Sequence, residues 1–306
     1  MKNIIKNTPI AISGLMLGLA GLGNLIAPYG SIYKTAAGIL SAAIALLLIS
    51  RFIFFYPDCL KDLENSIIAS VALTFPMGIM ILSTYIKNIS HQAALFSWYT
   101  AVVLHALLIL LFSFKFIINF DIKKVFPSYF IVYVGIVVGT VTAPAFNRIQ
   151  LGQILFYFGF ICYMILLPVV SYRVFKIKQI AKPALPTLAI FTAPAGLCLA
   201  GYMSSFSEKN TFIFSLLLAL TLISAAAVIS YLPKMISIGF YPSFSAFTFP
   251  FVITGIGLKM SSIYLKEKFN FSFLKYPALI VELLAVILVI YVFLHYFKFL
   301  LNKAKY

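Results

Sequence analysis

Apolar residues fill ten long stretches of the chain, and short polar connections separate them. A helix needs about 20 apolar residues to cross the hydrocarbon core of a bilayer, and most of these stretches are that long. They predict transmembrane helices near residues 9–26, 34–56, 67–88, 92–119, 127–147, 150–172, 186–205, 210–233, 244–265 and 274–300. Because the connections are short, we expect one membrane domain over residues 1–306 and no separate soluble domain.

The ten stretches alternate between two compositions. The odd-numbered ones hold most of the glycines and, in four of them, a threonine two residues before a mid-span proline. These Thr-x-Pro pairs are Thr74 and Pro76, Thr142 and Pro144, Thr192 and Pro194, and Thr248 and Pro250. The first stretch carries Gly14, Gly18 and Gly21 instead. The even-numbered stretches consist mainly of Ala, Leu, Ile, Val and Phe.

This alternation predicts an all-α architecture with inner and outer helices. Proline inside a helix removes a backbone hydrogen bond, and in lipid the freed group must be satisfied by neighbouring protein or by a water-filled cavity. We therefore expect five helical hairpins, each supplying one inner, odd-numbered helix to a central pore. The alternative is that small residues only allow helices to approach closely. That alternative explains the glycines, but not four prolines at the same depth.

Composition and charge agree with a multi-pass membrane protein. The 306 residues are 63% hydrophobic and 10% charged, whereas charged residues form about a quarter of a soluble domain. Fifteen of the 23 Lys and Arg residues fall on one side of the predicted topology and eight on the other. The positive-inside rule then places both termini in the cytoplasm, and we expect the cell membrane as the location.

The net charge of +16 changes the expected partners only slightly. The basic residues lie in short loops on both faces and form no stripe with interleaved aromatic residues, so we expect no nucleic-acid partner. The lipid bilayer is the expected surrounding. A positive potential at both mouths of a pore would concentrate small anions, which are the expected transported species.

Candidate catalytic chemistry is sparse. The three cysteines lack the spacing of a zinc site or a redox pair, and we expect no metal, no cofactor and no catalytic residue. Asp58, Asp62 and Glu64 share one loop. A membrane-embedded transferase would need such acids near a bilayer face, as metal ligands or a general base. No histidine accompanies them, so an enzyme is a remote alternative.

Several polar side chains are expected inside the membrane. Glu282 in the tenth span and His105 in the fourth are intramembrane ionisable residues, which are candidate functional groups by default. Both belong to outer helices, so we expect structural roles, although a proton-coupled exporter would need one of them in the pathway. The four threonines of the Thr-x-Pro pairs either offer hydroxyls to a passing anion or bond carbonyls of their own helices.

Seven pieces of the sequence occur in the order typical of a known family. They are residues 9–24, 74–78, 133–136, 182–187, 193–196, 241–242 and 246–250, and the last contains the most specific piece, Phe-Thr-Phe-Pro. On these pieces the chain resembles the tellurite-resistance/dicarboxylate transporter family. That family includes bacterial TehA-type proteins, fungal malate and sulfite transporters, and the slow-type anion channels of plant guard cells.

The resemblance implies ten helices in five hairpins with quasi-fivefold symmetry, a homotrimer, and a pore through each protomer. It also implies that Phe249 of the ninth helix occludes this pore as a gate, with Phe75 of the third span as its weaker counterpart. The expected function is a gated anion channel or exporter for small inorganic anions or carboxylates, ranked by their dehydration cost. A proton-coupled dicarboxylate or tellurite exporter is the alternative.

Overall fold

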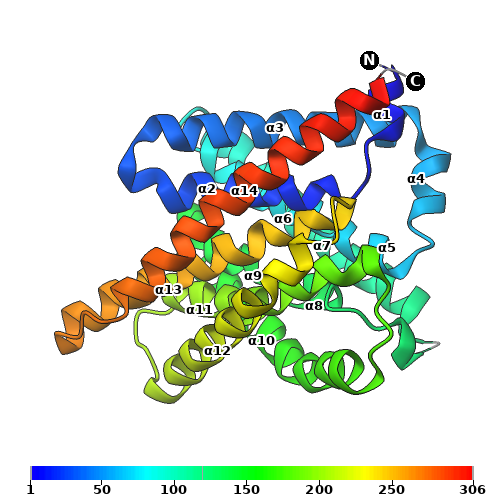
Figure 1. Ribbon diagram of the computed structural model, residues 1–306. Coiled ribbons are helices and arrows are strands. Elements are labelled where there is room, and N and C mark those ends of the chain that lie inside the picture. Colours follow the sequence, from blue (N-terminus) through cyan, green and yellow to red (C-terminus); the bar gives the residue numbers. More distant parts are fainter. Residues whose placement is uncertain (1, 119, 305–306) are drawn as a thin grey trace.

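The computed structural model describes residues 2–118 and 120–304, and all regular structure in these ranges is helical (Figure 1). Two parts of the predictions lie outside the described residues. They are Lys305, one of the Lys and Arg residues counted for the topology, and the last residue of the fourth expected span. The elements are α1 (Lys2–Asn7), α2 (Ile12–Ile26), η1 (Ala27–Tyr29), α3 (Ser31–Phe54), α4 (Tyr56–Asp62), α5 (Ser66–Ala72), α6 (Thr74–Ile86), α7 (His91–Phe116), η2 (Ile122–Lys124), α8 (Tyr129–Tyr133), α9 (Val137–Thr142), η3 (Ala143–Phe146), α10 (Ile149–Tyr172), η4 (Arg173–Ile177), η5 (Lys182–Thr192), α11 (Ala193–Ser205), α12 (Thr211–Ile236), η6 (Pro242–Phe247), α13 (Phe249–Phe269) and α14 (Lys275–Ala304).

Nine helical segments of the described chain are long and apolar enough to cross a membrane, and they coincide with nine of the ten expected spans. The fifth expected span, 127–147, instead contains the short pieces α8, α9 and η3. Gly135 lies in the turn between α8 and α9, where a Cβ atom would overlap the carbonyl oxygen of Ile131. The chain is therefore an all-α, multi-pass membrane protein whose fifth apolar stretch is irregular.

The odd-numbered segments form the interior of the bundle. Of the most apolar eighteen residues of each span, 56–78% are buried in the first, third, seventh and ninth, but only 28–39% in the even-numbered spans. In Figure 1, α9 and α11 lie in the middle of the bundle, between α3 on one edge and α10 and α12 on the opposite edge. The expected division into inner and outer helices is present, while the five-hairpin count and the quasi-fivefold symmetry stay predictions.

The mid-span prolines lie at the starts of helical pieces within the inner segments. Helix α6 begins two residues before Pro76, and α11 and α13 each begin one residue before Pro194 and Pro250. Pro144 is likewise the second residue of η3. A proline in the first turn replaces an N–H group that has no partner within the helix, so no hydrogen bond is lost. These four inner segments are therefore helical pieces joined end to end.

The threonines of the Thr-x-Pro pairs contact the backbone at the breaks between these pieces. Each hydroxyl lies within hydrogen-bond distance of the carbonyl oxygen three residues earlier. The pairs are Thr74 and Val71 (2.7 Å), Thr142 and Gly139 (3.3 Å), Thr192 and Ala189 (3.0 Å), and Thr248 and Ser245 (2.7 Å). These carbonyls belong to the last turn before each break. Three of them also accept a backbone N–H group: Val71 from Leu73, Gly139 from Ala143 and Ser245 from Thr248. Two roles were considered for the threonines, donation to a passing anion and bonding to nearby carbonyls of the same segment. These contacts are of the second kind.

Candidate functional site

The inner segments enclose a common cavity of about 540 Å³. Its wall contains residues of α2, α5, α6, α8, η5, α11, η6 and α13. Among the long outer helices only α3 contributes, through Arg51. Exposed residues of the connections, such as Lys6, Asn65 and Ala181, form one rim, so the cavity opens at that end. The rim includes α1, which lies beside the end of α14 (Figure 1).

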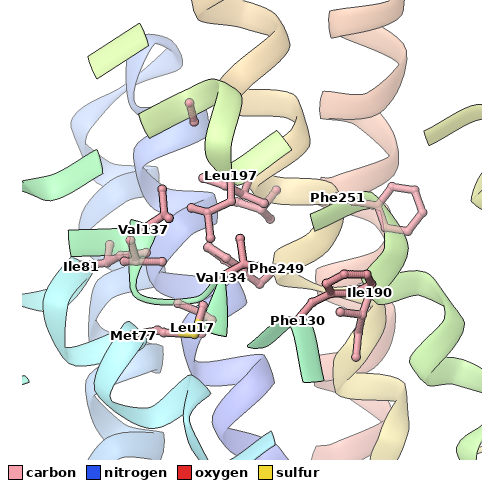
Figure 2. Packing of buried hydrophobic residues seen from close by; sticks show 14 of the residues in the cluster. Leu17, Met77, Ile81, Phe130, Val134, Val137, Ile190, Leu197, Phe249 and Phe251 are labelled. Atoms are coloured by element: carbon pink, nitrogen blue, oxygen red, sulfur yellow. The ribbon is translucent and has the colours of Figure 1, made fainter. Parts of the chain in front are cut away.

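Five buried apolar side chains of the cavity wall, one from each inner segment, lie next to one another. They are Leu17 of α2, Met77 of α6, Val134 in the turn after α8, Leu197 of α11 and Phe249 of α13. Figure 2 shows Phe249 and Val134 at the centre of this group, with Leu17 and Met77 on one side and Leu197 on the other. Phe249 is only 4% exposed. We call these five residues the apolar plug.

The position of Phe249 follows from the helix break and from glycines on the neighbouring helix. Phe249 is the first residue of α13, directly after the break at Thr248. A Cβ atom on Gly18 would lie 2.5 Å from Cβ of Thr248, and one on Gly21 would lie 3.4 Å from the ring of Phe249. Helix α2 can therefore approach the start of α13 at Thr248 only because Gly18 lacks a side chain. Gly18 packs against Thr248 and the backbone of Phe249, while Gly14 lies in the cavity wall.

The structure divides the remaining predicted pore residues. Thr74, Pro194 and Pro250 lie in the wall of the central cavity. Thr142, Pro144, Thr192 and Thr248 lie outside the wall, and Phe75 and Pro76 face a second cavity between α3 and α7. The hydroxyl of Thr142 accepts a hydrogen bond from Nε1 of Trp98, 2.7 Å away. Trp98 is fully buried at this contact.

Sequence reasoning did not single out four members of the apolar plug. Leu17, Met77, Val134 and Leu197 are ordinary apolar residues within apolar stretches. Their spacing from the nearest break gives no common signal either, because Met77 follows its proline directly and Leu197 follows its proline by three residues. The distribution of glycines and prolines located the inner segments, but not the side chain that each one turns toward the cavity.

The charges around the cavity favour anions. Three helices, α6, α11 and α13, place first-turn residues in its wall, and a helix N-terminus carries about half a positive charge. Within the described part of the chain, the charged side chains of the wall are Lys6, Arg51 and Asp62. All three belong to elements at the open end, and two of them are positive. The basic side chains thus lie at the open end of the cavity, and the helix N-termini lie beside the apolar plug.

Arg51 and Asp62 form an ion pair at the open end. Nη2 of Arg51 lies 2.6 Å from Oδ2 of Asp62, and the other guanidinium nitrogens of this buried arginine have no partner among the described residues. Cys59 packs beside them, with Sγ 3.8 Å from the carbonyl oxygen of Arg51. Burial raises the pKa of the Cys59 thiol, although the charge of Arg51 acts in the opposite direction. Asp62, one of the three acids that a transferase would need, is thus engaged by Arg51.

Neither predicted intramembrane ionisable residue lies in the cavity wall. Oε1 of Glu282 accepts a hydrogen bond from Nζ of Lys259 at 2.8 Å, which links α14 to α13. The ammonium group of Lys259 thus turns toward this carboxylate. His105 is fully buried on α7, with Nε2 3.1 Å from the carbonyl oxygen of Val132. It lies behind Gly135, which is part of the wall.

Comparison with known protein families matches residues 7–297 to a family described as voltage-dependent anion channel, SLAC1. The matched range includes every inner segment and the whole apolar plug. No curated protein matches the chain.

The ion pair between Lys259 and Glu282 can be tested with a double-mutant cycle. We expect Lys259→Met to lower the free energy of unfolding by about 3–5 kcal/mol, because it leaves a buried carboxylate without a partner. Glu282→Gln should cost less, since Lys259 is the more exposed partner and can turn to water. Thermal unfolding in detergent should show the double variant to be more stable than Lys259→Met alone. Simple addition of the two losses would contradict the pairing.

Proposed function

Because the chain belongs to the voltage-dependent anion channel family, we propose that its pore follows the central cavity and is gated by Phe249. The observation that carries this proposal is the apolar plug, to which each inner segment contributes one buried side chain. Phe249 is the largest of these side chains. A hydrophobic constriction closes a pore by excluding water, so an ion that reaches it must lose its hydration shell.

The transported species that we propose are small inorganic anions or carboxylates. Helix N-termini and Lys6 support this charge preference, since the charge of Arg51 is balanced by Asp62. The plug itself offers no charged side chain to replace the water that an ion loses. Dehydration cost therefore ranks the anions, and weakly hydrated ones pass most readily. A gated channel and a passive exporter share this geometry and differ only in the direction of net flux.

We also propose that the open end of the cavity faces the cytoplasm and that the protein is a homotrimer. The orientation is supported by the excess of Lys and Arg on the side of the termini. The trimer is supported by the family resemblance. Since one chain encloses the whole cavity, each protomer would conduct independently.

Replacement of the gating ring is the most direct test of the proposed channel. We expect Phe249→Ala to raise anion current by about tenfold or more, the change that a barrier lowered by ~1.4 kcal/mol produces. Planar-bilayer or oocyte recordings in chloride, nitrate and malate measure it, with the wild-type protein beside the variant.

Phe251→Ala is the matched control for this experiment. Phe251 is also buried on α13, but it points away from the apolar plug (Figure 2). Its truncation removes the same ring from the same helix without opening the cavity, so the current should stay at the wild-type level. Equal currents in the two variants, or no current in Phe249→Ala at normal expression, would contradict the gate.

The dependence on pH separates a passive pore from a proton-coupled exporter. With Phe249→Ala, we expect the reversal potential to follow the anion gradient and to ignore a pH gradient imposed at constant anion concentrations. The reason is that Glu282 is paired with Lys259 and His105 lies behind the wall, so neither side chain lines the cavity. A reversal potential that shifts with the pH gradient would favour the coupled exporter.

A further inference from the structure

A second cavity, of about 420 Å³, lies on the outer side of the inner segments. Helices α3 and α7 form its sides, and the break between α5 and α6 forms its floor. The rim residues Ile53 and Leu111 are 67% and 63% exposed, whereas Leu73 in the floor is 2% exposed. The cavity is therefore a groove between two outer helices, open toward the hydrocarbon core of the membrane. We call it the α3–α7 groove.

The wall of this groove is almost entirely hydrocarbon. Among its side chains, only Ser13 and Lys115 are polar. The hydroxyl of Ser13 donates to the carbonyl oxygen of Ile10 at 2.7 Å and lies 2.7 Å from the hydroxyl of Thr74. Its hydrogen bonds are therefore made within the protein. A ligand in the groove meets apolar side chains until it reaches Lys115.

The floor of the groove is also the back of the central cavity. Ile10 lies in the walls of both cavities, and Thr74, which contacts Ser13 of the groove, faces the central one. A single layer of side chains thus separates the two spaces. Any occupant of the groove packs directly behind the break at which α6 begins.

Lys115 places a positive charge at one end of the groove. It lies in the last turn of α7, where a long side chain reaches the membrane surface. Its Nζ donates to the carbonyl oxygen of Leu63 at 3.2 Å, which leaves two of its three N–H donors for another acceptor. Among the described residues, no carboxylate lies within 4 Å of this ammonium group.

We propose that the α3–α7 groove binds one acyl chain of an anionic phospholipid, whose phosphate accepts hydrogen bonds from Lys115. The membrane supplies this occupant, because α3 and α7 are membrane-spanning helices with largely exposed surfaces. Charge complementarity selects an acidic headgroup, since a zwitterionic one brings an ammonium group of its own close to Lys115. The site does not depend on the channel proposed above.

Native mass spectrometry of the full chain in detergent tests this site, with dioleoyl phosphatidylglycerol and dioleoyl phosphatidylcholine titrated separately. We expect one phosphatidylglycerol to be retained per protomer. Lys115→Gln should weaken its binding by about fivefold, the effect of one basic residue at a membrane surface, and leave phosphatidylcholine unchanged. Lys234→Gln, in the last turn of α12, is the matched control and should change neither lipid.

Filling the groove tests the acyl-chain contact independently of charge. Ala72→Phe, and the smaller change Ala69→Leu, place extra carbon atoms in the wall and should reduce the retention of both lipids. Size-exclusion chromatography verifies that each variant is folded. Undiminished phosphatidylglycerol binding in Lys115→Gln or in both filled variants would overturn the proposal. A filled variant that changes the number of chains per complex but keeps its lipid would also overturn the proposal, because a second copy of the chain would then occupy the groove.

Discussion

The structure depends on pairing every backbone group at the breaks of the inner helices, because the surrounding membrane offers no water to do so. Threonine hydroxyls contact the carbonyls just before the breaks, and further hydroxyls connect neighbouring helices. The hydroxyl of Thr248 is also 2.9 Å from the carbonyl oxygen of Gly14, and that of Thr254 is 3.0 Å from the carbonyl oxygen of Thr192. The breaks therefore tie α2, α11 and α13 together at the backbone. These contacts hold the three helices beside one another around the central cavity.

The same breaks determine what surrounds the cavity. The breaks before α6, α11 and α13 each start a new helix, whose first turn directs partial positive charge toward the cavity. The break before α13 also fixes Phe249 at the start of a helix, where the glycines of α2 leave space for its ring. The proposed attraction of anions and the proposed closure by the apolar plug would thus follow from one backbone feature. Membership of the voltage-dependent anion channel family connects this geometry with anion transport.

Much of the fold could be predicted from the sequence, because glycine and proline leave direct traces of close packing and of helix breaks. The irregular fifth stretch could not, since the need for glycine at position 135 arises from the local turn and is invisible in an apolar run. The resemblance pointed to Phe249, but Val134 and Leu197 depend on the rotation of each segment about its own axis. The partnership of Lys259 with Glu282 likewise depends on how α13 faces α14, which no spacing along the chain reveals.

The central claim is that Phe249 separates the open cavity from the opposite side of the membrane. Ala246→Cys places a thiol in the cavity wall, in a background where Cys59, Cys162 and Cys198 are replaced by alanine. A membrane-impermeant, anionic methanethiosulfonate is then added from the side opposite the termini, and the labelling rate is measured with and without Phe249→Ala. We predict labelling from that side only when the ring of Phe249 has been removed. Equal labelling with the ring present, or none in either protein although reagent from the other side reacts, would contradict the account.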